Sequence, residues 1–338
     1  MNFIQSHPGQ FELLKKIYNF RSDVARIGYD VDDFTKTLND SKCEKIFMIV
    51  SYPDHEKFMK IGFNHKEKLI SVVDPFTFYT NLNKKYTRKI TGFDYIKFLT
   101  YYDLFPRPYY AYGLTLSAEI ARRMSVNNLL ACEFGVYTGT GLFAMSSIAK
   151  LISHESDINF KIFGFDTGEG LPEVGDWRDH PEIWYTGDMK MPNFENLKKT
   201  LYDNCELILG DVKNTISENY EKMFSDRILS FISIDVDTYQ STRSCLKIFT
   251  YDAKNYLPVI PTWVDDSYVN VFQSSYSGEA LAIHEFNYSN LRKIDKKIIR
   301  TNRSQQVWHH CFYFTHIFDH PLRNNKNAHN FYINCHEF

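Results

Sequence analysis

The hydrophobic pattern of the chain becomes regular from residue 129 onward, where short apolar runs alternate with amphipathic stretches. Five runs are apolar over most of their length: residues 129–134, 160–165, 205–209, 228–234 and 256–264. Stretches with the helical spacing of apolar residues lie between them: 142–152, 193–202, 212–223 and 241–251. Strands that alternate with helices form βαβ units and a parallel sheet. Near-continuous apolar strands indicate that both faces of this sheet are buried.

Further elements extend the pattern on both sides. The spacing predicts helices at 114–124 and 278–290, and extended runs follow at 297–302 and 311–318. The sequence therefore predicts an α/β fold with a doubly wound, mostly parallel sheet of seven strands.

The first hundred residues follow a different pattern, with a helical stretch at 11–20 and an extended stretch at 46–50. The segment from Phe105 to Tyr109 reads FPRPY, and its prolines indicate a boundary. We expect an N-terminal accessory region of α+β type at 1–105, the α/β domain at 106–325 and a C-terminal tail at 326–338. The accessory region is either a small domain or an oligomerisation arm.

A carboxylate stands at or just past the carboxyl end of each of the five predicted strands: Glu133, Asp166, Asp211, Asp235 and Asp265. The carboxyl ends of parallel strands meet at one edge of the sheet, where open α/β folds bind their ligands. We therefore expect these side chains to share a binding site. Plainer roles stay open for single members, which can be turn residues at strand ends or helix caps.

The loop after the first of these strands is rich in glycine and reads EFGVYTGTGLFA from Glu133. Its second half, from Gly139, matches the dinucleotide fingerprint G-x-G-x-x-A, with Asp166 downstream for a ribose. The pattern that starts at Glu133 places Gly135 two residues later. This pattern is that of class I methyltransferases, which bind S-adenosylmethionine. We favour this second interpretation, because an ammonium and a sulfonium suit an acidic neighbour and a pyrophosphate does not.

The loop and four later segments resemble the macrocin O-methyltransferase family of class I S-adenosylmethionine-dependent methyltransferases. These segments are GFDTGEGLP at 164–172, GDVKNT at 210–215, IDVDTYQST at 234–242 and DDSY at 265–268. The resemblance covers residues 105 to about 320. This family methylates hydroxyls on deoxysugars of macrolides and related natural products, and a Rossmann-like fold is expected with it.

The resemblance implies a role for each matching residue. Residues at the methionine end, the ribose and the adenine of the cofactor form one implied set: Glu133, Gly135, Val136, Tyr137, Gly139, Gly141, Asp166, Thr167, Asp211, Val212 and Asp235. It also implies that Asp235, Asp265 and Asp266 bind Mg²⁺, and that Asp235 is the catalytic base.

The chemistry of methyl transfer is compatible with these three carboxylates. The acceptor oxygen must be aligned with the methyl group and lose its proton, which Asp235 or a nearby histidine can take. Carboxylates from two adjacent strand ends offer the hard oxygen ligands that Mg²⁺ prefers, and a bound cation lowers the pKa of an alcohol. The same cluster can instead hold an ammonium group or sugar hydroxyls without a metal, Asp266 can be a turn residue, and Asp237 can cap the next helix.

The segment at 173–191 is too long for a simple connection and carries Trp177, Arg178, Trp184 and Tyr185. Long loops over the edge of an α/β sheet often form lids or substrate walls. A contact with another subunit or a passive cover are the alternatives.

Composition narrows the class of protein. The chain has 338 residues, 43% of them apolar and 24% charged, as in ordinary globular proteins. The net charge of −2 creates no field that attracts nucleic acid or an anionic membrane. No apolar run approaches the roughly 18 residues that span a bilayer, the first residues do not form a secretion signal, and the six cysteines are far apart, as expected of reduced thiols. We expect a cytoplasmic protein with no nucleic-acid or membrane partner, either monomeric or homo-oligomeric.

The sequence thus predicts an enzyme, an S-adenosylmethionine-dependent O-methyltransferase assisted by a divalent metal. Its acceptor is a hydroxyl of a sugar or of another polyhydroxylated small molecule, as in natural-product or glycan modification. Two alternatives remain: a nicotinamide-dependent oxidoreductase on a sugar nucleotide, and a non-catalytic binding protein with a cofactor fold.

Overall fold

The computed structural model describes residues 2–4, 46–49, 69–73, 92–101, 105, 107–265, 271–272, 274–296 and 307–324. Near the N-terminus, β1 (Asn2–Ile4), β2 (Ile46–Ile49) and β3 (Leu69–Val73) form a small parallel sheet in this order. Strand β2 confirms the extended stretch expected at 46–50. The helix expected at 11–20 lies outside the described residues.

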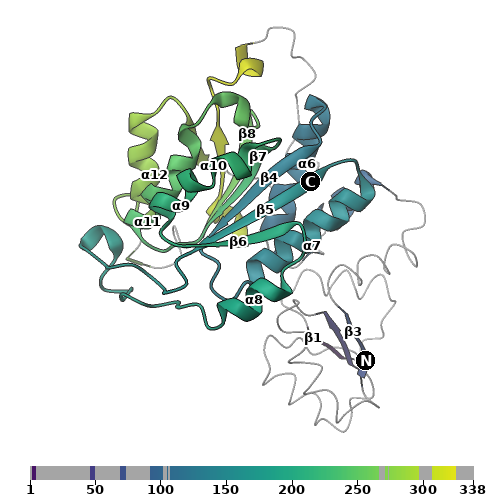
Figure 1. The fold of residues 1–338 in the computed structure, drawn as a ribbon, viewed down its shortest axis with the longest axis horizontal. Coiled ribbons are helices and arrows are strands. Elements are labelled where there is room, and N and C mark those ends of the chain that lie inside the picture. Colours follow the sequence, from purple (N-terminus) through teal and green to yellow (C-terminus); the bar gives the residue numbers. More distant parts are fainter. Residues whose placement is uncertain are drawn as a thin grey trace.

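A second sheet has seven strands in the order β6-β5-β4-β7-β8-β10-β9 (Figure 1). Its strands are β4 (Asn128–Phe134), β5 (Asn159–Asp166), β6 (Cys205–Leu209), β7 (Ile228–Ile234), β8 (Val259–Val264), β9 (Lys293–Lys296) and β10 (Phe312–His316). The first five strands in this order are mutually parallel, and β10 runs antiparallel to both β8 and β9. The predicted α/β fold with a seven-stranded sheet is therefore confirmed.

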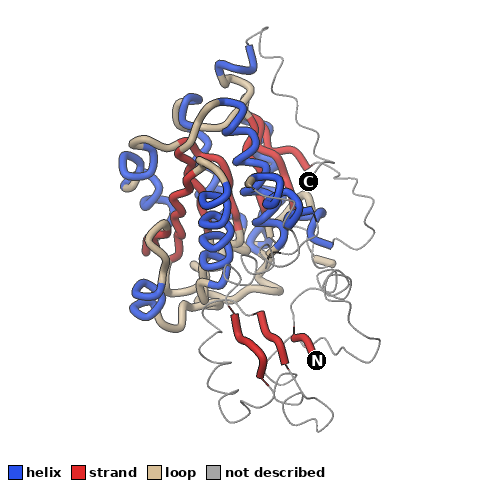
Figure 2. The backbone as a smooth tube through the Cα atoms, turned by 90° about the vertical axis from the view of Figure 1, so that its right-hand side faces the viewer, coloured by secondary structure: helices blue, strands red, loops and turns tan. Residues whose placement is uncertain are grey.

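Two groups of helices cover this sheet. The first group is α5 (Phe93–Tyr101), α6 (Pro108–Met124) and α7 (Thr140–Glu155), and all three contact one another. In the second group, α11 (Tyr239–Cys245) contacts both α9 (Val212–Glu218) and α12 (Gly278–Ser289). The two groups lie on opposite sides of the strands in Figure 1, and helices flank the strands in the side view of Figure 2. The remaining helices are short: α8 (Phe194–Thr200), α10 (Tyr220–Phe224), η2 (Trp177–Asp179), η3 (Leu246–Thr250), η4 (Ala253–Asn255), η5 (Val307–Cys311) and η6 (Pro321–Asn324).

Local chemistry explains where element boundaries differ from those expected. Helix α6 begins at Pro108, six residues early, because proline suits the first turn of a helix. The helix expected at 212–223 is divided at Asn219 into α9 and α10. Helix α11 begins at Tyr239 because the Thr238 side chain accepts a hydrogen bond from the Ser241 N–H at 3.3 Å. Thr238 therefore caps this helix, and Asp237 does not.

The last strands also shift along the chain. Strand β8 begins at Val259, directly after Pro258, which has no N–H to donate to a neighbouring strand. Strand β9 covers Lys293–Lys296, just before the extended run expected at 297–302, which lies outside the described residues. In the described ranges, no helix combines the length and apolar character that crossing a membrane requires.

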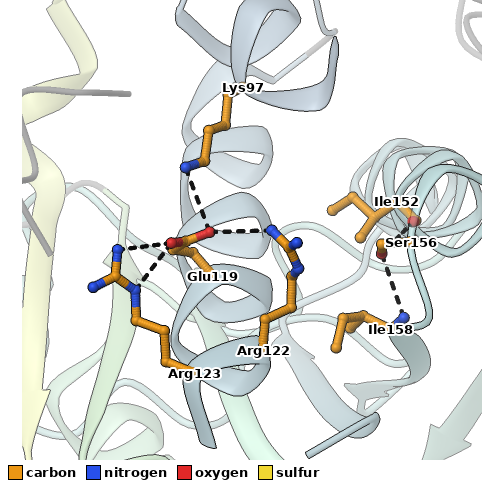
Figure 3. Close-up of polar contacts among 7 residues, drawn as sticks. All are labelled: Lys97, Glu119, Arg122, Arg123, Ile152, Ser156 and Ile158. Carbon is orange, nitrogen blue, oxygen red and sulfur yellow. Dashed lines mark hydrogen bonds and ion pairs between the residues drawn. The ribbon is translucent and has the colours of Figure 1, made fainter. Parts of the chain in front are cut away.

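Helix α5 joins the same hydrophobic core as the sheet and adds an ionic contact at its surface. Tyr95 and Ile96 of α5 are fully buried. The Glu119 carboxylate of α6 forms ion pairs with the Lys97 ammonium of α5 at 3.4 Å and with the Arg123 guanidinium of its own helix at 2.9 Å (Figure 3). Burial opposes ionisation of Glu119, but the hydrogen bonds and charges of Arg123 and Lys97 outweigh it and lower the pKa of the carboxyl group.

The same view shows how α7 ends. Ser156 Oγ donates to the Ile152 carbonyl at 2.7 Å and accepts from the Ile158 N–H at 3.3 Å (Figure 3). One hydroxyl thus satisfies a carbonyl of the last helical turn and the first amide before β5, which fixes the direction of the chain between the two elements.

We expect Glu119→Gln to lower the free energy of unfolding at neutral pH, because it removes the ion pairs with Lys97 and Arg123. The loss should be only about 1 kcal/mol, because these ion pairs are partly solvated. The folded-state pKa of Glu119 lies below its unfolded value, so this stabilisation is present above about pH 4.3 and is lost as the pH falls through the folded-state pKa. Urea unfolding at neutral and acidic pH measures it, with the exposed Glu218→Gln as control. Equal midpoints for wild type and Glu119→Gln at neutral pH would contradict this account.

Candidate functional site

The crevice of this sheet lies between the carboxyl ends of β4 and β7. From β4 the chain continues to β5 and β6 on one side, and later to β7 and β8 on the other. In open α/β sheets, ligands bind at such a switch point. A cavity of about 630 Å³ opens there. Its walls come from the ends of β4, β5 and β7, from the loop after β5, from the turn after β6 and from the segment before α6.

The cavity brings together most of the residues predicted from the sequence. The predicted cofactor residues that line it are Glu133, Gly135, Val136, Tyr137, Gly141, Asp166, Thr167, Asp211, Val212 and Asp235. Gly139 does not line it. A Cβ there would lie 2.3 Å from Leu197 Cδ1, so this glycine allows α7 to begin close to α8. Asp265 does not line the cavity either, and Asp266 lies outside the described residues.

Two glycines allow the close approaches on which the cavity depends. Gly135 has φ 85°, and a Cβ there would lie 1.7 Å from the Asp235 carbonyl oxygen. A Cβ at Gly141 would lie 1.7 Å from Glu133 Oε1. The first glycine lets the loop after β4 pass against the end of β7, and the second lets the Glu133 carboxylate sit at the start of α7.

Glu133 is buried, with different surroundings for its two carboxylate oxygens. Oε1 accepts a 2.6 Å hydrogen bond from the Tyr110 hydroxyl, which also lies 2.9 Å from Ser233 Oγ. Oε2 is buried and has no hydrogen-bond partner among the described residues. Burial raises the pKa of Glu133 to about 7, although Arg107 and Tyr110 oppose the rise. A ligand with a cationic donor would satisfy Oε2 and hold the carboxylate in its ionised form.

Arg107 is a site residue that sequence reasoning missed, because its segment was interpreted only as a boundary. Its φ of 53° is left-handed, and its guanidinium donates to Thr140 Oγ1 at 3.1 Å and to the Tyr109 hydroxyl at 3.0 Å. Burial lowers the pKa of Arg107, but Tyr109, Tyr110, Glu133 and Asp235 outweigh it and raise the pKa above its usual value. The cavity thus contains a fixed positive charge beside its carboxylates.

Asp166 holds the glycine loop in place. Its Oδ2 accepts from the backbone N–H groups of Val136 at 2.8 Å and Tyr137 at 3.0 Å, and its Oδ1 from that of Gly168 at 2.7 Å. A carboxylate has about four acceptor positions, so one is left for a ligand. Asp211 accepts from the Lys213 N–H at 2.8 Å and caps α9. Both residues therefore have the plainer structural role and also line the cavity.

The remaining carboxylates lie at the ends of β7 and β8. The Asp265 N–H donates to the Ile234 carbonyl at 2.8 Å, so Asp265 lies beside the end of β7, where Asp235 follows. Burial is the largest cause of the raised pKa of the Tyr109 hydroxyl, and the charges of Asp265 and Asp235 add to it while Arg107 opposes it. Tyr109 stacks on Trp263 of β8 at 3.9 Å. Within the described ranges, no group of three histidine, cysteine, aspartate or glutamate side chains is arranged to hold a metal ion. Asp235 and Asp265 are two of the three predicted ligands, and the third is not described.

Comparisons with known proteins give remote similarities. No protein-family model and no curated protein matches this sequence. Among solved structures, a calicheamicin methyltransferase, CalS11, is 17% identical, with a TM-score of 0.41, over 72% of this chain and 91% of its own. The O-methyltransferase NovP is 16% identical, with a TM-score of 0.40, and the match covers 60% of this chain and 76% of NovP. An apo structure of CalS11, described as a TDP-rhamnose 3'-O-methyltransferase, is 16% identical, with a TM-score of 0.35. This match covers 60% of this chain and 78% of the CalS11 chain. These values are too low to transfer an activity.

We expect Gly135→Ala to destabilise the fold by more than about 2 kcal/mol, because it adds a backbone clash with Asp235 to the strain of a positive φ. Gly187→Ala is the matched control: its φ of 87° is nearly the same, but nothing lies within 4 Å of the added Cβ. Chemical unfolding of both variants separates the two causes. Equal losses would show that the contact with Asp235 is relieved without cost.

Proposed function

We propose that this protein is an S-adenosylmethionine-dependent O-methyltransferase that acts on a hydroxyl of a sugar or of another polyhydroxylated small molecule. One observation carries the proposal: the buried carboxylate of Glu133 has an oxygen without a hydrogen-bond partner in the described chain, inside a cavity that also contains the Arg107 guanidinium. The two groups have opposite charges and lie near the start of α7.

This pair complements the methionine end of the cofactor, which is a zwitterion. Glu133 Oε2 would accept from the ammonium group. Arg107, which already reaches Thr140 at the first residue of α7, would bind the carboxylate together with the N-terminal end of this 16-residue helix. Asp166 Oδ1 would accept from a ribose hydroxyl, and Asp211 and Val212 would flank the adenine.

The same contacts disfavour a dinucleotide. A pyrophosphate needs the free N–H groups of the glycine loop, but Asp166 already accepts from those of Val136 and Tyr137. It would also approach the Glu133 carboxylate, which lies against Gly141. We therefore expect no change in fluorescence on titration with NADH.

In the proposed reaction, the acceptor oxygen attacks the methyl carbon, the carbon–sulfur bond breaks, and S-adenosylhomocysteine leaves. Asp235, at the carboxyl end of β7 and in the cavity lining, would take the proton of the acceptor hydroxyl. The cavity aligns donor and acceptor, which supplies much of the rate enhancement in a displacement of this kind.

The proposal includes a divalent cation at Asp235, Asp265 and Asp266, as the resemblance implies. Asp235 and Asp265 follow adjacent parallel strands, and the Asp265 N–H donates to the residue before Asp235, so the sheet offers two hard oxygen ligands at neighbouring strand ends. When bound, the cation would lower the pKa of the acceptor hydroxyl.

Cofactor binding tests the proposal. We expect S-adenosylhomocysteine to bind wild type in calorimetry, with an affinity that rises by up to about tenfold per pH unit below pH 7 and levels off above it. The sign follows from Glu133: its raised pKa leaves it mostly protonated below about 7, and the ammonium group of the ligand requires the ionised form. Glu133→Gln should bind more weakly and without this dependence, and Glu218→Gln should match wild type. Absence of binding to wild type would end the proposal, whereas binding without pH dependence would remove only the role of Glu133.

Chelation tests the metal separately. We expect EDTA to reduce methyl transfer at least about tenfold and added Mg²⁺ to restore it, because two or three carboxylates without a cation repel one another and an anionic acceptor oxygen. Asp265→Asn should weaken the dependence on Mg²⁺ while leaving S-adenosylhomocysteine affinity near that of wild type, since Asp265 lies outside the cavity lining. Turnover that EDTA leaves unchanged would remove the metal from the mechanism and leave Asp235 as the base.

A further inference from the structure

Backbone hydrogen bonds join the two ends of the loop between β5 and α8. The Leu171 N–H donates to the Asp188 carbonyl at 2.7 Å, and the Gly187 N–H donates back to the Leu171 carbonyl at 2.9 Å. The Met191 N–H reaches the Gly168 carbonyl at 3.3 Å. Residues 172–186 therefore form a closed excursion whose base is held beside the end of β5.

A second anchor ties this excursion to the end of β7. Asp179, which is 1% exposed, accepts from the Gln240 N–H at 3.1 Å with Oδ1, and from Gln240 Nε2 at 3.4 Å and the Gly175 N–H at 3.3 Å with Oδ2. The Arg178 guanidinium lies over the Tyr239 ring at 4.9 Å. Gln240 is the second residue of α11, directly after the turn that carries Asp235 and Asp237.

Trp184 lies between the two anchors and lines the cavity together with Asp235, Asp237 and Ser241. Its backbone N–H donates to the His180 carbonyl at 3.0 Å, next to Asp179. Its indole Nε1–H is buried and has no hydrogen-bond partner in the described part of the chain. Trp184 thus lines the cavity beside the turn that carries the proposed base, and its indole donor is unused in the described part of the chain.

We propose that Trp184 recognises the acceptor and that Asp179 is the positioning residue that holds Trp184 opposite Asp235. This inference rests on the proposed function and names the acceptor subsite within it. The indole face packs against the C–H face of a sugar ring, and Nε1–H donates to one of its hydroxyls. The carboxylates of the β7–α11 turn accept from others. A buried donor that stays unpaired is costly, so the site favours ligands with a hydroxyl at this position over apolar ones.

The proposed cofactor contacts and the proposed acceptor contact come from different segments of the chain. Glu133 and Asp166 lie at strand ends and Arg107 lies directly before α6. The hydrogen bonds described above for these three residues do not involve the excursion at 172–186. Substitution of Trp184 should therefore change acceptor affinity and leave cofactor affinity almost unchanged.

Three variants test this role of Trp184. Trp184→Phe keeps an aromatic ring and removes the donor, Trp184→Ala removes both, and Trp177→Phe is the control, because Trp177 lies in the same loop, is 62% exposed and does not line the cavity. Protein saturated with S-adenosylhomocysteine is titrated with a panel of methyl and p-nitrophenyl glycosides of hexoses and 6-deoxyhexoses, followed by tryptophan fluorescence and calorimetry.

We expect at least one glycoside to quench wild type, Trp184→Phe to weaken its binding about tenfold or more, and Trp184→Ala to weaken it further. The S-adenosylhomocysteine affinity should stay within about twofold in all three variants, and Trp177→Phe should resemble wild type throughout. Unchanged glycoside affinity in both Trp184 variants would overturn the proposal. So would a loss confined to S-adenosylhomocysteine, which would place the indole against the cofactor, or wild type that binds S-adenosylhomocysteine but no glycoside. Wild type that does not bind S-adenosylhomocysteine would instead refute the function on which the inference rests.

Asp179→Asn tests the positioning role. The amide keeps the shape but cannot accept from Gln240 and Gly175 as the carboxylate does. We expect KM for the best glycoside to rise about tenfold with little change in S-adenosylhomocysteine affinity, and the fluorescence quench on glycoside binding to decrease. Thermal unfolding of the variant shows whether it is folded. A folded variant with wild-type KM and quench would overturn the positioning role, and rescue of both by Asp179→Glu would support it.

Discussion

A single buried carboxylate constrains the centre of this fold. Glu133 is the last residue but one of β4, at the point where the order of the strands reverses. The burial that raises its pKa to about 7 must be compensated by its neighbours. Tyr110 donates to one oxygen, Arg107 supplies a positive charge, and Gly141 leaves the space the carboxylate occupies. Helix α6, which carries Tyr110, and helix α7, which begins beside Gly141, are therefore arranged around this one side chain.

Backbone strain is concentrated around the same cavity. In the described part of the chain, the residues other than glycine with a left-handed φ are Arg107, Ser125, Tyr137, His180, Met189 and Asp237. Four of them line the cavity: Arg107, Tyr137, Met189 and Asp237. Such conformations persist only where the surrounding structure holds them, and they are typical of ligand-binding sites. Here, hydrogen bonds to Asp166 hold Tyr137, and those of the guanidinium hold Arg107.

The two walls of the cavity differ in how they are fixed. The glycine loop is held by Asp166, whose carboxylate accepts from the N–H groups of Val136 and Tyr137. A second wall comes from the excursion at 172–186, which contributes Pro172 and Trp184 to the lining and which Asp179 ties to the start of α11. The first contact fixes the loop that follows Glu133, and the second fixes the loop that carries Trp184 to the helix that follows Asp235.

The sequence by itself determined the parallel strands and the edge at which they converge. Strands β4 to β8 were predicted within a few residues because burial on both faces leaves an uninterrupted apolar run, and the carboxylates at their ends mark one edge of the sheet. Tertiary structure alone decided that Arg107 and Glu133 line one cavity, that Gly139 serves helix packing, that Asp265 is outside the cavity lining, and that Asp179 binds the start of α11. Periodicity records whether a residue is buried, which is a local property. Which distant side chain it meets depends on how separate elements pack, and no local pattern encodes that.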